Sequence, residues 1–399
     1  MNPYLDRLQP YPFQKLRELF AGITPSTEYS AINLSIGEPK HATPEFIKQA
    51  LIANLDGLAS YPLTAGVPAL RIAIANWIAR RYAIPAPDTD TQILPVNGSR
   101  EALFAFAQTI IDPCFAEPVV ISPNPFYQIY EGAALLAGAQ PYYLPTLPEN
   151  GYRMEFSSVP ESVLARTQLV YVCSPGNPTG RVMTLDEWRE LFALSDRYGF
   201  VIAADECYSE IYFDEANPPL GAMQAAHQLG RTDYKNLVVF SSLSKRSNVP
   251  GMRSGFVAGD AAIIAKFLLY RTYHGSAMSP SVQMASAAAW DDEAHVVENR
   301  RLYAEKFAAV QPMLNSVMSA AMPDAAFYMW VRVPSGDDAT FARQLYQDYH
   351  VTVLPGSYLA RDADGINPGQ GFIRIALVAP VADCIAAARR IQQLIIQTS

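Results

Sequence analysis

The sequence has few of the residues that build metal or disulfide frameworks. Its four cysteines and five histidines are scattered along 399 residues, with no C-x-x-C pair and no H-E-x-x-H motif. We therefore expect neither a disulfide scaffold nor a structural metal site. A basic surface is also missing, because the formal net charge is −8 and no long basic run occurs. Nucleic-acid binding is consequently not expected as the main function.

Long uncharged apolar stretches are absent as well. The N-terminal segment MNPYLDRLQPYPFQKL carries proline and charge where a signal peptide needs an apolar core. No apolar stretch reaches the length of a membrane span. Half of the residues are hydrophobic and 17% are charged, as in ordinary globular proteins. We expect a reduced, cytoplasmic, metal-free protein.

The middle of the chain alternates short apolar runs with helical patterns. The runs are PVVISP (118–123), QLVYVCSP (168–175), FVIAADE (200–206) and NLVVFSS (236–242). Such continuous runs are typical of strands buried on both faces of a parallel sheet. Among the helical patterns, one starts at a Thr184–Glu187 capping box and ends at Gly199, and another is expected to be capped by Ser99. This alternation predicts an α/β domain with right-handed crossovers.

The pattern changes after about residue 285. A long helical stretch is followed by the strand-like runs AFYMWVRV, VTVLPG and FIRIAL, and then by a last helix. We expect a large domain at 45–285 and a smaller α+β domain made by 286–399 with an N-terminal arm, 1–44. The arm is rich in proline and should pack against the small domain or against a second subunit.

Polar residues follow the apolar runs at the edge where a parallel sheet binds its ligands. They are Asn177, Asp205, Tyr208, Ser242, Lys245 and Arg253, and the helix that begins near Gly98, Ser99 and Arg100 starts at the same edge. Each has an ordinary alternative role, in a turn, a helix cap, the core or a surface ion pair worth about 0–1 kcal/mol. Their coincidence at one edge predicts a site.

These residue types suit pyridoxal 5′-phosphate. That cofactor needs a lysine for its Schiff base, a carboxylate at its ring nitrogen, donors to its phenolate oxygen and a cradle for its phosphate. Lys245 and Asp205 fit the first two needs, and Asn177 and Tyr208 the third. The phosphate would be held by Arg253, by the Ser242 hydroxyl and by the backbone N–H groups of Gly98, Ser99 and Arg100.

The motifs resemble those of the fold type I, class I/II aminotransferases. SSLSKRSNVPGMRSG is similar to their lysine signature S-x-S-K-x-x-x-x-x-G-x-R-x-G, NPTG to their asparagine loop and DECY to their D-E-x-Y strand end. The resemblance covers essentially the whole chain. It implies the PLP-transferase fold, in which helices sandwich a mostly parallel seven-stranded sheet and a smaller α+β domain is attached.

The resemblance also implies roles that the residues alone do not reveal. Tyr127 would stack on the pyridine ring, and Tyr61 would reach the phosphate of the neighbouring subunit. Gly37, Asn177 and Arg374 would contact the substrate, with Arg374 binding its α-carboxylate through two parallel hydrogen bonds. A homodimer with shared active sites follows from the role of Tyr61.

Four further segments resemble the succinyldiaminopimelate aminotransferases: YPFQKLREL, INLSIGEPKHATP, LPVNGSREALFAFAQ and YRTYHGSAMSP. This resemblance implies ping-pong amino transfer between N-succinyl-LL-2,6-diaminopimelate and 2-oxoglutarate in lysine biosynthesis, with Lys245 as general base. Lys40, His41, Arg271 and His274 are candidates for the distal end of a long substrate. For Lys40 and His41 the alternative is an exposed loop.

Other functions stay open at this point. Acetylornithine, aspartate-type and aromatic donors fit the same chemistry, and a PLP lyase or decarboxylase would use the same scaffold. A non-catalytic regulator would need an added DNA-binding module, for which we expect no room before Leu34 or after Ile375.

Overall fold

The computed structural model describes residues 1–363 and 365–398. Its strands are β1 (Ile32–Asn33), β2 (Ile93–Val96), β3 (Val119–Asn124), β4 (Gln140–Pro145), β5 (Thr167–Cys173), β6 (Val201–Asp205), β7 (Leu237–Ser242), β8 (Gly255–Gly259), β9 (Tyr328–Arg332), β10 (Val351–Thr352), β11 (Leu354–Pro355) and β12 (Phe372–Ala376). Its α-helices are α1 (Pro12–Leu19), α2 (Glu45–Ala53), α3 (Pro68–Tyr82), α4 (Ser99–Ile110), α5 (Ile129–Leu136), α6 (Glu161–Leu164), α7 (Leu185–Tyr198), α8 (Ala222–Gln228), α9 (Leu243–Arg246), α10 (Ala261–His274), α11 (Pro280–Asp291), α12 (Ala294–Asn315), α13 (Asp338–Tyr349) and α14 (Val381–Thr398).

A seven-stranded sheet with the order β2-β8-β7-β6-β5-β3-β4 forms the centre of the molecule. The four apolar runs in the sequence correspond to β3, β5, β6 and β7, which pair in parallel. Only β8 runs against its two neighbours, β7 and β2. The connection from β7 to β8 carries the short helix α9 rather than a long crossover, so the chain returns in the opposite direction. The predicted mostly parallel sheet is confirmed.

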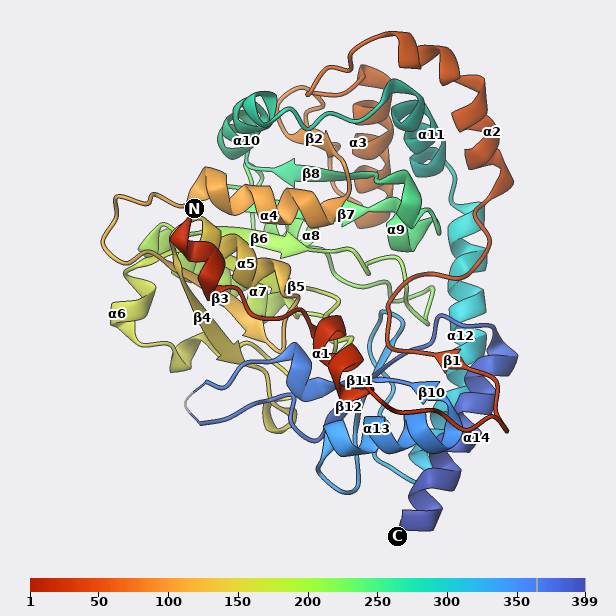
Figure 1. Cartoon of the computed structure of the whole chain (residues 1–399). Coiled ribbons are helices and arrows are strands. Elements are labelled where there is room, and N and C mark those ends of the chain that lie inside the picture. The colour runs from red at the N-terminus through yellow and green to blue at the C-terminus, as the bar shows by residue number, and fades with distance from the viewer. Residues whose placement is uncertain (364, 399) are drawn as a thin grey trace.

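Helices cover both faces of this sheet (Figure 1). Side chains of β5 show the alternation that a sheet buried on both sides requires. Val170 and Val172 pack in one core with residues of α3, α7, α8 and α11, whereas Leu169 and Tyr171 pack in another with residues of α4, α5 and α10. Both faces of the sheet are therefore covered by apolar cores, and polar side chains can gather only at the ends of its strands.

The two predicted helix caps have different outcomes. Thr184 and Glu187 form the expected capping box, and Gly199 ends α7 at a φ of 80°. Ser99 does not cap α4, because the helix begins at Ser99 itself and Gly98 occupies the preceding position with a φ of 84°. A Cβ atom on Gly98 would lie 2.5 Å from Nη2 of Arg253. Glycine is thus required there both by its backbone conformation and by the close approach of the arginine.

The C-terminal part builds a second layer around the antiparallel sheet β11-β12-β9. Its core includes residues of α12, α13 and α14 together with Ile32 and Leu34, because β1 pairs in parallel with β10. Farther upstream, Leu16 of α1 is buried beside Trp330 and Phe372. The N-terminal segment therefore packs against the C-terminal sheet, as the sequence led us to expect for its central part. The boundaries at 45 and 285 stay predictions.

Helix α12 runs along one side of the molecule, from the region of the large sheet to the C-terminal helices (Figure 1). It makes its most extensive helix contact with α14. None of the helices in the described part of the chain combines the length and apolar character that a membrane span requires.

Candidate active site

A cavity of about 470 Å³ opens at the carboxyl ends of the parallel strands. The predicted site residues that line it are Gly37, Ser99, Arg100, Tyr127, Asn177, Asp205, Tyr208, Ser242, Lys245, Arg253 and Arg374. Gly98 adjoins the cavity through its contact with Arg253. The structure thus brings together residues that lie up to 337 positions apart in the chain, since 374 − 37 = 337.

Lys245 projects from α9, the short helix that starts directly after β7. The hydroxyl of Ser242 caps this helix by accepting a hydrogen bond from the Ser244 N–H at 3.1 Å. The Lys245 ammonium donates to the carbonyl oxygen of Gly37 at 2.5 Å. Burial lowers the pKa of Lys245 to about 8, and the charges of Arg374 and Arg253 act in the same direction. The neutral form of this amine, which a nucleophile or base needs, is therefore far more populated near neutral pH than that of an ordinary lysine.

Asp205 ends β6 and is only 4% exposed. One carboxylate oxygen accepts from the Tyr130 hydroxyl at 2.7 Å and the other from the Cys207 N–H at 3.2 Å. Burial raises the pKa of Asp205, while hydrogen bonds from Cys207 and Tyr130 oppose the shift. Asp205 takes part in no ion pair within the described residues, so its carboxylate is available to a cationic N–H group in the cavity.

The start of α4 offers an anion cradle. Ser99 and Arg100 of its first turn line the cavity, no side chain caps the helix start, and Arg253 lies against Gly98. Arg253 adopts a left-handed backbone conformation with a φ of 54° and anchors its guanidinium on the Pro250 carbonyl at 2.9 Å. Ser99 also accepts a hydrogen bond from the Cys207 thiol at 2.8 Å. The hydroxyl of Ser242, which also lines the cavity, bonds to the Ser244 hydroxyl at 2.9 Å and to the Ser254 carbonyl at 3.1 Å.

Arg374 forms the wall nearest the C-terminal sheet and is 4% exposed. Its two terminal nitrogens donate to Asn177 Oδ1 at 2.9 Å and to the Ser35 carbonyl at 2.8 Å, and the guanidinium lies 4.4 Å from the centroid of the Tyr328 ring. Its Nε is buried and has no partner among the described residues. An unpaired buried donor next to a cavity suits an anionic ligand.

Several functional neighbours were not evident from the sequence. Tyr328 bonds to the hydroxyl of Tyr208 at 2.9 Å, and a Cβ atom on Gly37 would lie 1.9 Å from the Tyr328 hydroxyl. Tyr130 holds Asp205, while Tyr11 and Phe13 bring the N-terminal segment into the cavity wall. Neither Tyr130 nor Tyr328 was singled out from the sequence, and of the two only Tyr328 lines the cavity.

Five of the predicted residues do not line the cavity. Tyr61 is fully exposed, and Lys40 pairs with Glu38 at the surface. His274 is exposed and stacks on Tyr270. Arg271 is 0% exposed and paired with Glu101 at 2.9 Å, and His41 bonds to Asn299 and Lys306. The structure therefore argues against Arg271 and His41 as substrate ligands, because internal partners occupy their polar atoms.

The donor set fits pyridoxal phosphate. One cavity is lined by a lysine with a lowered pKa, by a buried carboxylate without an ion-pair partner, and by a helix start with an arginine. The glycine at this helix start lets the arginine approach closely, because a Cβ atom there would clash with it. The same donors would not suit a metal, and no group of three metal-binding side chains occurs within residues 1–363 and 365–398.

Comparisons with known proteins agree with this geometry. The family model for aminotransferase class I and II matches residues 29–391. The LL-diaminopimelate aminotransferase of Dehalococcoides mccartyi is 30% identical over 387 residues, which is 95% of each chain. A solved aminotransferase from Neisseria meningitidis Z2491 is 57% identical with a TM-score of 0.96 and covers 99% of this chain and 100% of its own.

A solved structure from Thermus thermophilus is described as a probable N-succinyldiaminopimelate aminotransferase. It is 25% identical, with a TM-score of 0.82, and covers 96% of this chain and 97% of its own. The family model and the Dehalococcoides relative each span nearly the full length of the chain. This chain therefore belongs to the class I and II aminotransferases, a family that depends on pyridoxal 5′-phosphate.

Proposed function

We propose that this aminotransferase moves an amino group between N-succinyl-LL-2,6-diaminopimelate and 2-oxoglutarate by a ping-pong mechanism. The proposal rests on one observation: Arg374 and Lys245 line the same cavity of about 470 Å³. Nε of Arg374 has no partner among the described residues, and the pKa of Lys245 is lowered. The diaminopimelate skeleton is supported by the names of two relatives, one acting on it directly and one on its succinylated form.

In the proposed mechanism each residue has one task. Pyridoxal phosphate, when bound, supplies the electron sink for negative charge at the substrate Cα. Arg374 binds the α-carboxylate of the donor and then of 2-oxoglutarate, since both carry this group. Asp205 would hold the proton on the ring nitrogen. Lys245 would act as the general base that moves the Cα proton of the donor to the cofactor, and in the second half-reaction it would move a proton back to Cα of the product amino acid.

The remaining side chains orient these groups. Asn177 fixes the Arg374 guanidinium at 2.9 Å, and Tyr208 with Asn177 would donate to the phenolate oxygen. Tyr127 would cover the ring, and Gly98, Ser99, Arg100, Ser242 and Arg253 would form the phosphate cradle. Tyr11, Phe13 and Leu359 form apolar parts of the cavity wall and would limit the access of water to the reacting atoms.

A second candidate donor is LL-diaminopimelate itself, because curated relatives of about 30% identity carry that name. A donor panel with 2-oxoglutarate separates the two, with acetylornithine, aspartate and tyrosine as further donors. We expect kcat/KM to be highest for the succinylated donor, by about 10-fold or more over the free diamino acid. A preference for LL-diaminopimelate would overturn the substrate assignment, and ammonia or CO2 release without amino transfer would overturn the reaction type.

We further propose a cytoplasmic homodimer with shared active sites. The segment 52–63 and helix α10 expose apolar side chains to a degree unusual in a monomer: Ile52 58%, Leu58 68%, Tyr61 100%, Leu63 74%, Leu269 54% and Tyr273 88%. All four cysteines are free, which suits a reducing compartment.

Mixed dimers test the sharing of sites. Tyr61→Ala and Lys245→Ala subunits should each have low activity alone. Refolded together at equal concentrations, they should regain roughly a quarter of wild-type activity, because half of the dimers are mixed and each mixed dimer holds one intact site. A mixture with no more activity than its components would refute the shared site. Light scattering on the wild type checks the dimer independently.

A further inference from the structure

A buried hydrogen-bond chain runs behind the cavity and ends on the backbone of Lys245. The Lys306 ammonium contacts Nε2 of His41 at 2.7 Å, and Nδ1 of His41 contacts Oδ1 of Asn299 at 2.7 Å. Nδ2 of Asn299 then donates to the carbonyl oxygens of Lys245 at 3.2 Å and of Arg246 at 3.4 Å. Lys306 is 3% exposed and Asn299 2%. Burial thus protects the Asn299 amide that contacts the backbone, whereas the His41 ring between the two side chains is partly exposed.

The hydrogen bonds from Lys306 to Lys245 can be assigned in one direction only. An ammonium only donates, so Nε2 of His41 accepts and Nδ1 carries the proton of the neutral ring. Nδ1 then donates to Oδ1 of Asn299, which also accepts from Asn248 at 3.1 Å. This leaves the amide N–H₂ of Asn299 to face the two carbonyls. Burial lowers the pKa of His41, and the charge of Lys306 adds to the shift, which keeps the ring neutral.

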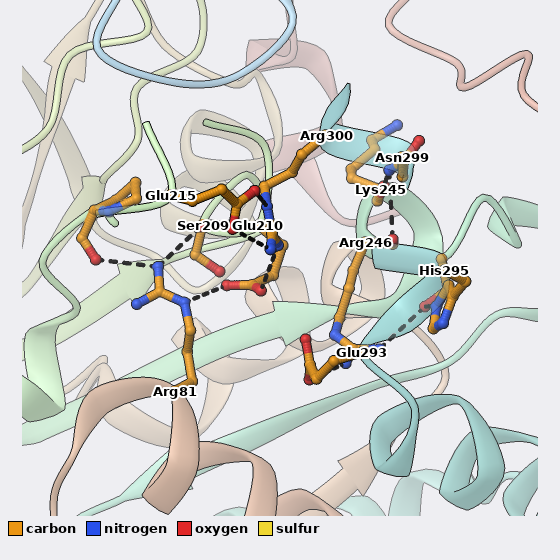
Figure 2. Close-up of polar contacts among 12 residues, drawn as sticks. Arg81, Ser209, Glu210, Glu215, Lys245, Arg246, Glu293, His295, Asn299 and Arg300 are labelled. Carbon is orange, nitrogen blue, oxygen red and sulfur yellow. Dashed lines mark hydrogen bonds and ion pairs between the residues drawn. The ribbon is translucent and has the colours of Figure 1, made fainter. Parts of the chain in front are cut away.

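The start of α12 and the residue before it also hold the next two residues of the turn. Glu293, just before the helix, pairs with the Arg246 guanidinium at 2.6 Å (Figure 2), and Nε2 of His295 bonds to the Ser247 hydroxyl at 2.8 Å. Three consecutive residues, 245 to 247, are thus tied to α12 and the residue that precedes it. The loop that carries His41 also contacts the side chain of Lys245, because the carbonyl oxygen of Gly37 in this loop accepts a hydrogen bond from the Lys245 ammonium.

One part of this arrangement could be mistaken for a second active site. Asp292, His295 and Ser247 form a hydrogen-bonded series with spacings of 2.5 and 2.8 Å, like that of a hydrolase triad. Ser247, however, is 0% exposed, and Arg246 donates to its hydroxyl at 3.3 Å. No substrate could reach this oxygen, so the series supports the turn rather than a reaction.

We propose that Asn299, oriented by His41, is a positioning residue for Lys245: it fixes the peptide from which the catalytic side chain projects into the cavity. The proposal rests on the catalytic role of Lys245 given above. Movement of that peptide displaces the amine directly, and a misplacement of about 1 Å can cost on the order of 10²-fold in rate. We expect substrate binding at Arg374 to be unaltered, because neither Asn299 nor His41 lines the cavity.

The test compares Asn299→Ala and His41→Phe with Tyr303→Phe as the matched control. Tyr303 lies on the same helix, is 0% exposed and packs on the His41 ring, but its hydroxyl has no partner in the described structure. Each holoenzyme is assayed for kcat and for KM of both substrates with the best donor of the wild type. The pKa of the Lys245-linked cofactor is read from its visible absorbance, and the unfolding temperature is recorded.

We expect both test variants to lose about 10- to 100-fold in kcat while KM changes by less than about 3-fold. The absorbance pKa should shift in both, and Tyr303→Phe should match the wild type in all readouts. His41→Phe decides alone if Asn299→Ala does not fold. Wild-type kcat in a folded test variant, or an equal loss in Tyr303→Phe, would overturn the proposal.

A Lys245→Ala enzyme assayed in parallel separates the two levels of the argument. If it retained full transamination, the catalytic role of Lys245 itself would be wrong. If only the Asn299 and His41 variants retained full kcat, the catalytic role would stand and the positioning role would be refuted.

Discussion

Replacing Lys245 with methionine should stabilise the cofactor-free protein at neutral pH. The folded protein lowers the pKa of this lysine from 10.5 to about 8, chiefly through burial. The unfolded chain therefore binds the proton more tightly, and the folded state loses stability at every pH below the unfolded value. The penalty is fully present below pH 8, declines between pH 8 and 10.5, and disappears above that range.

The magnitude follows from the shift. Proton linkage gives a penalty of about 3 kcal/mol at pH 7 and about 1 kcal/mol at pH 10. Methionine removes this penalty but cannot donate to the Gly37 carbonyl, and that lost hydrogen bond costs about 1 kcal/mol. Lys245→Met should therefore be about 2 kcal/mol more stable than the wild type at pH 7 and about equal to it at pH 10.

Urea unfolding of both apo proteins at pH 7, 8.5 and 10 measures this difference. Lys266→Met is a suitable control, because residue 266 is exposed on α10 and burial does not oppose its charge. If the Lys245→Met protein were less stable than the wild type at pH 7, burial of the charged lysine would not destabilise the folded protein, and the reasoning would be wrong. A stability gain that does not change with pH would show that it comes from packing instead.

Three substitutions in the cavity follow from the same contacts. Arg374→Lys should raise KM for both substrates by about 10- to 100-fold, since a lysine cannot make two parallel hydrogen bonds to a carboxylate. Steady-state kinetics would contradict a shared α-carboxylate site if KM rose for one substrate alone. Asp205→Asn should lower kcat by about 10²-fold or more and weaken cofactor binding in an equilibrium titration, because a neutral amide cannot hold charge on the ring nitrogen; normal turnover would place that role elsewhere. Tyr130→Phe removes the 2.7 Å donor to Asp205 and should cost about 10-fold in kcat, and an unchanged kcat would show that the Cys207 N–H suffices.

The sequence predicts the fold and the centre of the site because both depend on strong local signals. Buried parallel strands need continuous apolar runs, and chemistry can start only where these runs end. Lys245 and Asp205 each come within three residues of such an end. Arg374 stands out for another reason, as a charged residue inside a buried strand.

The partners of these residues are not predictable in the same way. Tyr130 reaches Asp205 across 75 residues, and Asn299 reaches Lys245 across 54. Nothing in the local pattern around either one distinguishes it from a core tyrosine or a helical asparagine. Arg271 is the converse case: it was a candidate for the distal end of the substrate, but it lies in α10 and pairs with Glu101, 170 residues away. Pairing across such distances is decided by packing alone.

The order of the strands along the chain has a consequence for synthesis. Every strand of the seven-stranded sheet precedes residue 260, so Gly98 and Arg253, the predicted phosphate ligands, are synthesised before the C-terminal sheet. Arg374 emerges about 120 residues after Arg253, since 374 − 253 = 121, which takes roughly 6 to 24 s at ~5–20 residues per second. Arg374 is thus the last of the predicted cavity residues to be synthesised. A product truncated before β12 would contain every other predicted residue that lines the cavity but would lack Arg374.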